Sequence, residues 1–178
     1  MLTPQELFDR LAALGIAHRT VEHAPVFTVE EAKEHRGVLP GHHIKNLFLR
    51  NKKEEMWLVV AIEDRAIDLK RLGEGLGAGR LSFGSPERLL RTLGVAPGSV
   101  TPFAVVNDTD RKVTLVLDRG LQAEGAINAH PLTNTMTSAL SLADLLRFFE
   151  STGHVPRWLD IPTRVIPNEE RDPSLKRG

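Results

Sequence analysis

The sequence predicts an α+β domain built around a mixed, largely antiparallel β-sheet, and three observations support this prediction. Short apolar, β-branched segments follow one another through polar turns, as the strands of hairpins do. Helical patterns with clear start signals stand at the beginning, in the middle and at the end of the chain. The length of 178 residues suits one domain with a single substantial core. We therefore expect residues 1–178 to form one domain with about five to seven strands.

The first elements are predicted from their start signals. The segment Thr3–Glu6 contains a cap residue, a proline for the first helical position and a capping-box glutamate, so residues 4–14 are expected to form a helix. Residues 16–22 alternate as a short strand. A second capping box opens the segment Thr28–Gly37 and predicts a short helix there.

The middle of the chain predicts a hairpin followed by short helices and strands. Two apolar strands, 47–50 and 56–62, are joined through the polar turn 51–55. The glycines of residues 73–79 lack the flanking strand and helix of a dinucleotide-binding fingerprint, which indicates a flexible loop instead. The other expected elements are a helix at 68–76, a short strand at 80–83 and a helix at 86–93.

The C-terminal half predicts more strands and one more helix. Residues 103–106 and 113–117 are expected to be strands, and residues 133–137 are expected to be extended because threonine-rich segments disfavour helix. Ser141 caps a helix over 142–150. From about residue 163 the chain is proline-rich and charged, which predicts a loosely held tail.

Composition excludes several classes of function. The formal net charge is zero, so any basic surface must be a local patch. There is no cysteine, which excludes a disulfide framework, a thiolate nucleophile and a cysteine-ligated zinc site. The N-terminal segment is neither basic nor followed by an apolar core, so we expect no signal peptide there, and no apolar run reaches membrane-spanning length. We expect a cytoplasmic protein without a membrane contact.

The first segment with chemical potential is Ala129–Thr137, in which an apolar run leads into His130. Pro131 biases His130 toward extended backbone, and hydroxyl and amide side chains follow, among them Asn134 and Thr135. Two interpretations are open at this point. His130 either caps a strand end beside a threonine ladder or belongs to a functional site.

The second segment is Gly41–Arg50, in which Lys45 and Asn46 stand between a glycine loop and a buried strand. A lysine at the mouth of a strand suits an anionic or carbonyl oxygen, although it can also extend its amine to solvent without a function. His42 and His43 are adjacent, so on extended chain they point apart and cannot share a metal ion. We expect no metal site and no cofactor.

The third segment, Gly98–Pro102, has a glycine and a proline on either side of Ser99, Val100 and Thr101. Such a rigid turn can direct several backbone N–H groups at one point, as stabilisation of an oxyanion requires. Turns of this kind are common, so this segment indicates a functional site only in combination with the other two segments.

These segments together resemble the YbaK/prolyl-tRNA-synthetase-associated editing domain family, most closely its freestanding ProXp-ala (PrdX-like) branch. The residues that carry the resemblance are Gly41–Leu49, Gly98–Val105, Asn107–Asp108 and His130–Thr137. The resemblance spans nearly the whole chain. It implies a barrel-like sheet with flanking helices, and an enzyme that hydrolyses mischarged tRNA in trans, with Ala-tRNA(Pro) as substrate.

The resemblance also assigns roles to individual residues. Lys45, Gly98 and His130 are the expected catalytic residues, and Asn46, the turn Ser99–Pro102, Asn134, Thr135 and Arg80 are expected to bind the substrate. The partner is the acceptor end of tRNA(Pro), with transient contact to prolyl-tRNA synthetase. The basic residues Lys45, Arg50, Lys52, Lys53 and Arg80 would meet the acceptor stem, although a solvated hairpin rim explains Lys52 and Lys53 nearly as well.

Two other functions stay open. Editing of another mischarged tRNA, such as Cys-tRNA(Pro), would use the same fold. A non-catalytic nucleic-acid-binding module would explain the basic residues, but the zero net charge and the low aromatic content of 5% argue against it. Whether His130 is a base or a binding group is not decided by the sequence.

Overall fold

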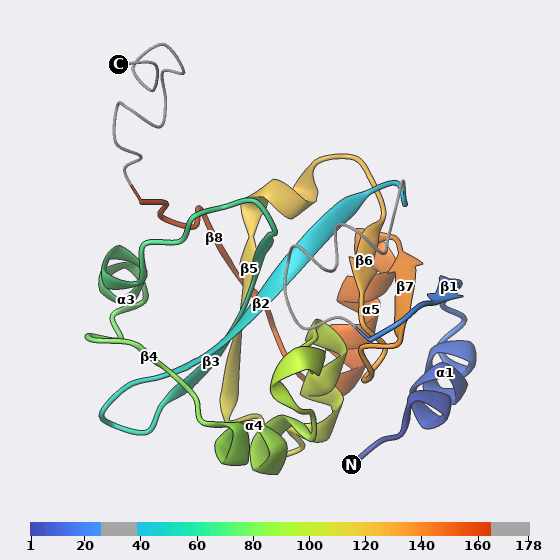
Figure 1. Ribbon diagram of the computed structural model, residues 1–178, viewed down its shortest axis with the longest axis horizontal. Helices are drawn as coiled ribbons and strands as arrows, with labels where there is room; N and C mark the ends of the chain where they lie inside the picture. The colour runs from blue at the N-terminus through green and yellow to red at the C-terminus, as the bar shows by residue number, and fades with distance from the viewer. Residues whose placement is uncertain (26–38, 165–178) are drawn as a thin grey trace.

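An eight-stranded sheet runs through the part of the chain that the computed structural model describes, residues 1–25 and 39–164 (Figure 1). Its strand order is β1-β7-β6-β2-β3-β5-β8, and β4 also pairs with β2. The strands are β1 (Arg19–Glu22), β2 (His42–Arg50), β3 (Met56–Ile62), β4 (Ser82–Phe83), β5 (Val113–Asp118), β6 (Ile127–Ala129), β7 (Met136–Leu140) and β8 (Arg157–Leu159).

The sheet is mixed, and the predicted fold class is confirmed. Strand β2 pairs antiparallel with β3 and β4, and β7 pairs antiparallel with β1 and β6. The pairings β2–β6, β3–β5 and β5–β8 are parallel. The path begins at β1 and ends at β8, so the sheet is not closed.

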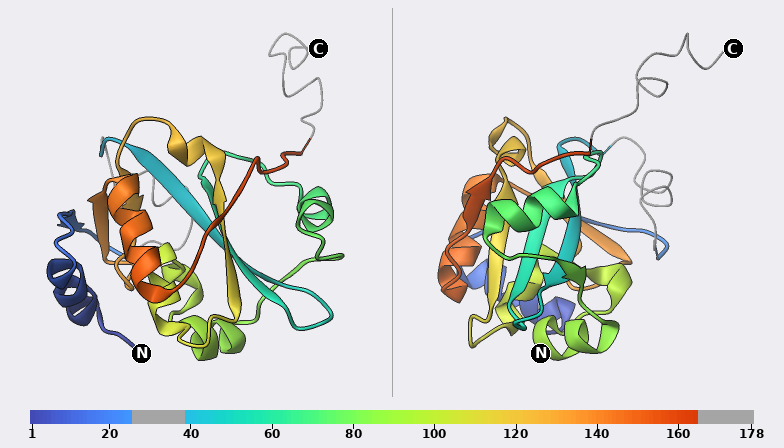
Figure 2. Two further views of the ribbon diagram at one scale, coloured as in Figure 1. Left: turned by 180° about the vertical axis from the view of Figure 1, so that it is seen from behind. Right: turned by 90° about the vertical axis from the view of Figure 1, so that its left-hand side faces the viewer.

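Helices cover both faces of the sheet and bury one apolar cluster on each side (Figure 2). The larger cluster contains residues of α1, α4, α5 and the 3-10 helix η2. The smaller cluster lies under α3, against alternate residues of β2 and β3. The helices are α1 (Pro4–Ala13), α3 (Leu69–Leu76), α4 (Pro86–Leu93) and α5 (Leu142–Thr152), with 3-10 helices η1 (Pro97–Ser99), η2 (Pro102–Asn107) and η3 (Arg119–Gln122).

The predicted helix starts are confirmed wherever the structure describes them. Thr3 forms the capping box with Glu6 at the start of α1, and Ser85 and Ser141 accept the first free amides of α4 and α5. The predicted helix at Thr28–Gly37 lies outside the described residues, as does the expected tail from residue 165 onward. Thr163, at the start of that tail, still pairs with Ile67.

The prediction of a strand at 103–106 is wrong, because these residues belong to η2. The segment begins with a proline, and the Thr101 side chain accepts the Phe103 amide at 3.3 Å, which caps a helical turn. All residues from Pro102 to Val106 are buried. A short apolar run that is buried on every side carries no periodicity to separate helix from strand.

The prediction of extended chain over 133–137 is wrong for its first part, since β7 begins only at Met136. Leu132 has a positive φ of 65°, and its amide donates to the His130 carbonyl oxygen at 3.0 Å, so the chain turns directly after His130. Thr133 and Thr135 bond each other at 3.0 Å through their hydroxyl groups. Short polar side chains here bond locally instead of joining a ladder.

The placement of Lys45 at the mouth of a strand is also wrong. Strand β2 begins at His42 rather than near residue 47, because β6 pairs in parallel with His42 and His43. Lys45 therefore lies well inside a nine-residue strand, directly opposite Ala61 of β3.

Candidate active site

The three predicted segments meet at the first half of β2. Asn46 of β2 donates through Nδ2 to the Val100 carbonyl oxygen at 3.2 Å, which joins the strand to the 98–102 turn. On the neighbouring strand β6, Asn128 pairs with His43, and His130 follows two residues later. Parts of the chain that lie far apart in sequence are thus brought to one place on the sheet.

The Lys45 side chain is held by the main chain of the β3–α3 connection. Its Nζ donates to the Arg65 carbonyl oxygen, and the Arg65 guanidinium bonds the buried Asp118 carboxylate at 2.5 Å. Burial lowers the pKa of the Lys45 amine, and the nearby Arg164 lowers it further, while Asp64 and Glu63 raise it. Lys45 is therefore a half-buried cation in a fixed position, bound to a neutral acceptor.

Asn46 has one satisfied and one unsatisfied side-chain atom. Its Nδ2 is bonded to Val100, but its Oδ1 is buried and accepts no hydrogen bond from the described part of the protein. An unpaired buried acceptor costs about 1–3 kcal/mol. This oxygen is therefore available for a donor that belongs to a ligand.

The 98–102 turn keeps two of its amides free of the protein. The Ser99 amide closes the turn onto the Ala96 carbonyl oxygen at 2.9 Å, and the Thr101 hydroxyl is taken up by the Phe103 amide. Within residues 1–25 and 39–164, the amides of Val100 and Thr101 donate to no protein acceptor. Gly98 lies in η1, and Pro102 is buried at the start of η2.

The two ring nitrogens of His130 differ in their contacts with the described part of the protein: one is bonded to it and the other is not. Its Nδ1 lies 2.9 Å from the Met136 carbonyl oxygen, which can only accept, so Nδ1 carries the proton in the neutral ring. Burial lowers the pKa of His130, the bond to Met136 raises it, and the nearby His23 lowers it. The other ring nitrogen, Nε2, is left with a free lone pair and bonds no described residue of the protein.

His23 belongs to this site, and sequence reasoning missed it. Its ring centroid lies 6.1 Å from that of His130. Its Nδ1 is 2.8 Å from the Ala24 carbonyl oxygen, so Nε2 accepts from the Thr137 hydroxyl, also at 2.8 Å. The His23 amide donates to the Thr135 carbonyl oxygen at 2.9 Å. A lone histidine after a short strand gives no sequence signal for such contacts.

Three predicted substrate-binding residues remain to be placed: Thr135, Asn134 and Arg80. Thr135 lies beside His23 through its carbonyl oxygen, and Asn134 stands next to it in the turn before β7. Arg80 is exposed on the connection between α3 and β4, and no described contact joins it to Lys45.

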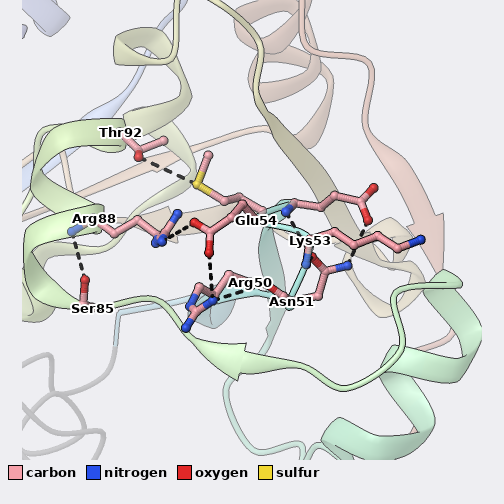
Figure 3. Close-up of polar contacts among 9 residues, drawn as sticks. Arg50, Asn51, Lys53, Glu54, Ser85, Arg88 and Thr92 are labelled. Atoms are coloured by element: carbon pink, nitrogen blue, oxygen red, sulfur yellow. Dashed lines mark hydrogen bonds and ion pairs between the residues drawn. The ribbon is translucent and has the colours of Figure 1, made fainter.

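The basic residues of the β2–β3 turn are partly neutralised, as Figure 3 shows. Glu54 pairs with Arg50 at 3.3 Å and also with Arg88 of α4. Lys52 and Lys53 are exposed at the tip of this turn. The expected basic group is therefore weaker than the sequence indicates.

A cavity of about 720 Å³ is lined by residues of β1, β6 and β7, among them Val21, Asn128 and Thr137. Neither His23 nor His130 is among its lining residues, but Thr137, which does line it, bonds His23. The described residues contain no group of three or more His, Asp or Glu side chains arranged to hold a metal ion. They also contain no helix with the length and apolar character needed to cross a membrane.

Comparison with a protein-family model gives a match over residues 23–148, and the model describes an aminoacyl-tRNA editing domain. This range contains Lys45, the 98–102 turn, His130 and His23.

Relatives with similar sequences cover most of the chain. The prolyl-tRNA synthetase associated domain-containing protein 1 of Danio rerio is 45% identical over 154 residues, which is 85% of this chain and 84% of the relative. The prolyl-tRNA editing protein ProX of Acetoanaerobium sticklandii is 35% identical over 158 residues, 88% of this chain and 96% of the relative.

A solved structure has the same fold. The crystal structure of a candidate trans-editing enzyme for prolyl tRNA synthetase superposes with a TM-score of 0.67, over 92% of this chain and 100% of the other. The identity is 22%, so this likeness concerns the fold alone.

Proposed function

The chain belongs to the aminoacyl-tRNA editing domain family, and from this premise we propose that it is a trans-acting deacylase that hydrolyses mischarged Ala-tRNA(Pro). The observation that carries the proposal is the meeting of the three segments at the first half of β2. A cation, a buried free acceptor, two free amides and a neutral imidazole can each serve ester hydrolysis on a charged polymer. Such an enzyme works where translation takes place, in the cytoplasm.

The reaction places two demands on the site. An aminoacyl ester joins an amino acid to a ribose hydroxyl of the terminal adenosine, and water must attack its carbonyl carbon. The tetrahedral intermediate carries a negative oxygen that needs preorganised donors. The free amides of Val100 and Thr101 suit that oxygen, and loss of one such donor costs about 3–4 kcal/mol in other enzymes.

The neutral His130 suits the water or a hydroxyl group of the ribose. Because Nδ1 is committed to Met136, Nε2 is the atom that accepts a proton or a hydrogen bond. Its lowered pKa keeps this nitrogen unprotonated at neutral pH. In this proposal His130 accepts from the attacking water or orients the ribose, with its tautomer already set.

Lys45 and Asn46 suit the charged ends of the substrate. The Lys45 amine is bonded to a neutral carbonyl oxygen, so it can exchange this acceptor for a phosphate of the tRNA at little cost. The α-ammonium group of the amino acid would supply the missing donor to Asn46 Oδ1. In this proposal Gly98, Ser99 and Pro102 shape the turn, Thr135 holds the His23 amide through its carbonyl oxygen, and Asn134 contacts the substrate. Arg80 would meet the acceptor stem.

Selectivity for alanine follows from size. A pocket that admits alanine can reject the larger proline ring by steric exclusion, as the second sieve of an editing system does. Contacts with the smaller side chain alone would contribute only about 1–3 kcal/mol per methylene-sized difference. Ala-tRNA(Ala) carries the same amino acid, so it must be distinguished through its acceptor stem.

A deacylation assay with four substrates tests the proposal. Purified protein should hydrolyse Ala-tRNA(Pro), and it should leave Pro-tRNA(Pro) and Ala-tRNA(Ala) largely intact. Preferred hydrolysis of Cys-tRNA(Pro) would assign a different substrate to the same site. Absence of hydrolysis with all four esters, together with retained tRNA binding, would instead indicate a non-catalytic binding module.

A further inference from the structure

Phe83 is the one large aromatic side chain that is strongly exposed in the described part of the chain, with 59% of its surface accessible. It lies in β4, a two-residue edge strand whose only partner among the described strands is β2. An exposed phenylalanine on a strand edge contributes little to the core, so its aromatic face is available for a contact outside the protein.

Phe83 lies on the same face of the sheet as Lys45. It pairs directly with Leu49, and residues directly opposite in a ladder share a face. Lys45 lies four residues before Leu49 in β2. Side chains four residues apart on a strand point to the same face, and their Cα atoms are about 13 Å apart along the strand. The half-buried Leu47 lies between them on that face.

The position of Phe83 is fixed by its neighbour Gly84. The Gly84 amide donates to the Phe48 carbonyl oxygen at 2.9 Å, and a Cβ at Gly84 would come within 2.4 Å of the Phe48 ring. Only glycine allows β4 to approach β2 so closely here. Phe83 is therefore mounted on a rigid element, which lowers the entropy cost of binding.

Two cations lie on α3 and on the chain that enters β4. Arg80 and Lys70 line a cavity of about 560 Å³ between α3 and the chain that enters β4, together with Leu69, Leu81, Gly79 and Glu74. Both cations are exposed, and neither forms a hydrogen bond or ion pair with another described residue. Glu74 carries the opposite charge, so the cavity has an excess of one positive charge.

From these observations we propose that Phe83 is a stacking platform for the unpaired 3′ end of the tRNA, with Lys70 and Arg80 as contacts for its phosphates. The inference rests on the deacylase function proposed above. Aromatic side chains beside a basic surface are the recognised means of binding single-stranded nucleic acid without sequence preference. Lys45 and Phe83 lie about 13 Å apart along β2, a distance that the unpaired end of a tRNA can span around the buried Leu49.

The test compares two substrates with variants of Phe83. In single-turnover deacylation of Ala-tRNA(Pro), Phe83→Ala should raise the apparent Kd for the tRNA about 5- to 100-fold with little change in the maximal rate. Phe83→Leu should behave like Phe83→Ala, because leucine is apolar but has no aromatic face, and Phe83→Trp should retain binding. Alanyl-adenosine, which lacks the preceding nucleotides, should be hydrolysed equally by all variants.

Matched control variants distinguish loss of the Phe83 contact from a general effect of surface substitutions on tRNA binding. Leu90 of α4 is exposed to the same extent, 59%, but its helix packs against the larger cluster on the other side of the sheet, so Leu90→Ala should leave tRNA binding unchanged. Lys70→Ala should weaken tRNA binding and reduce its salt dependence, whereas Lys112→Ala, at an exposed position before β5, should not.

The outcomes distinguish the two proposals. In one outcome, wild-type protein hydrolyses Ala-tRNA(Pro), and the Phe83→Ala and Leu90→Ala variants bind this tRNA equally well. This result would overturn the stacking platform but would leave the deacylase function standing. Equal losses for Phe83→Ala on alanyl-adenosine and on the tRNA ester would also overturn it, because the effect would then be on the reaction centre. Wild-type protein that hydrolyses neither ester would remove the function on which this inference rests.

Discussion

Lys45 and Asn46 are neighbours in β2, and their side chains face opposite sides of the sheet. Lys45 pairs with Ala61 on the face of the cluster under α3, whereas Asn46 pairs with Val60 on the face of the larger cluster. The two residues therefore act on different parts of the site. Lys45 lies on the face that α3 covers, where its amine bonds the Arg65 carbonyl oxygen, and Asn46 lies next to the 98–102 turn.

Replacement of Lys45 should separate activity from stability. Lys45→Ala removes a half-buried cation whose only described hydrogen bond is to the Arg65 carbonyl oxygen, so the free energy of unfolding should change by about 1 kcal/mol or less. The value of kcat/KM for Ala-tRNA(Pro) should fall by about tenfold or more, because a charge-assisted contact to the substrate is lost. Urea unfolding and steady-state deacylation measure the two effects. A folded Lys45→Ala protein with normal activity would exclude Lys45 from the site.

Replacement of Asn46 should also affect activity more than stability. Asn46→Ala removes the bond to Val100, which costs about 1 kcal/mol, but it also removes the unsatisfied Oδ1. These changes oppose each other, so the unfolding midpoint should move little. Deacylation should slow, because the turn is no longer attached to β2. A large loss of stability at full activity would show that Asn46 serves only the fold.

The pH dependence of deacylation should report His130. Only the neutral imidazole can accept a proton, and burial holds its pKa below the ordinary value of 6.5. The rate should therefore persist below pH 6.5 and decline only as the pH falls through the lowered pKa. The same lowered pKa disfavours protonation of the folded protein, so this group reduces stability as the pH falls below 6.5. The His130→Ala variant should lose most of the deacylation rate, and the rate that remains should no longer decline at acidic pH.

The buried pair Asp108–His154 should make stability sensitive to acid. His154 Nε2 lies 2.9 Å from the Asp108 carboxylate, which also accepts the amides of Lys112 and Val113. Burial raises the pKa of Asp108, but these hydrogen bonds outweigh it and lower the pKa below the ordinary value of 3.8. The stabilisation is present above pH 3.8 and is lost as the pH falls through the lowered pKa.

Asp108→Ala leaves several buried donors without an acceptor, so the free energy of unfolding should fall by about 3–5 kcal/mol at neutral pH. Thermal unfolding at several pH values measures this, with Asp110→Ala at an exposed position as the control. Equal melting temperatures for the two variants would contradict the prediction.

Chelators should not affect the reaction, because the proposed chemistry uses a neutral imidazole and backbone amides. Deacylation of Ala-tRNA(Pro) should proceed at the same rate before and after dialysis against EDTA. The free Mg²⁺ must be restored before the assay, since tRNA itself needs it to fold. Loss of activity with rescue by zinc would show that a metal ion takes part.

Local sequence signals predicted the helix starts, since a cap needs only a side chain and an amide three residues away. Thr3, Ser85 and Ser141 make such contacts. The 3-10 helix η2 was not predictable in this way, because its residues are apolar and buried on all sides. The start of β2 at His42 depends on pairing with β6, whose residues come more than eighty positions later.

Some residues of the candidate site are likewise marked by the local sequence, and others are placed only by distant pairing. Lys45, the 98–102 turn and His130 stand out in the sequence as polar groups beside apolar strands. Asn107 and Asp108, which also carry the family resemblance, bind the protein itself: Asn107 bonds Leu2 and Leu93, and Asp108 bonds His154. His23 approaches His130 only because β1 pairs with β7, so no local pattern marks it.

The pairing of β1 with β7 also determines when the enzyme can first work during its synthesis. Arg19 pairs with Ala139, and the Thr20 hydroxyl bonds that of Ser138, 118 positions away. The nascent chain must therefore hold β1 unpaired until β7 has left the ribosome. Contacts of such long sequence separation form slowly, because closure of a long loop costs entropy before any pairing repays it. His23 receives its Thr135 and Thr137 partners only at that last stage, so a growing chain has no complete site.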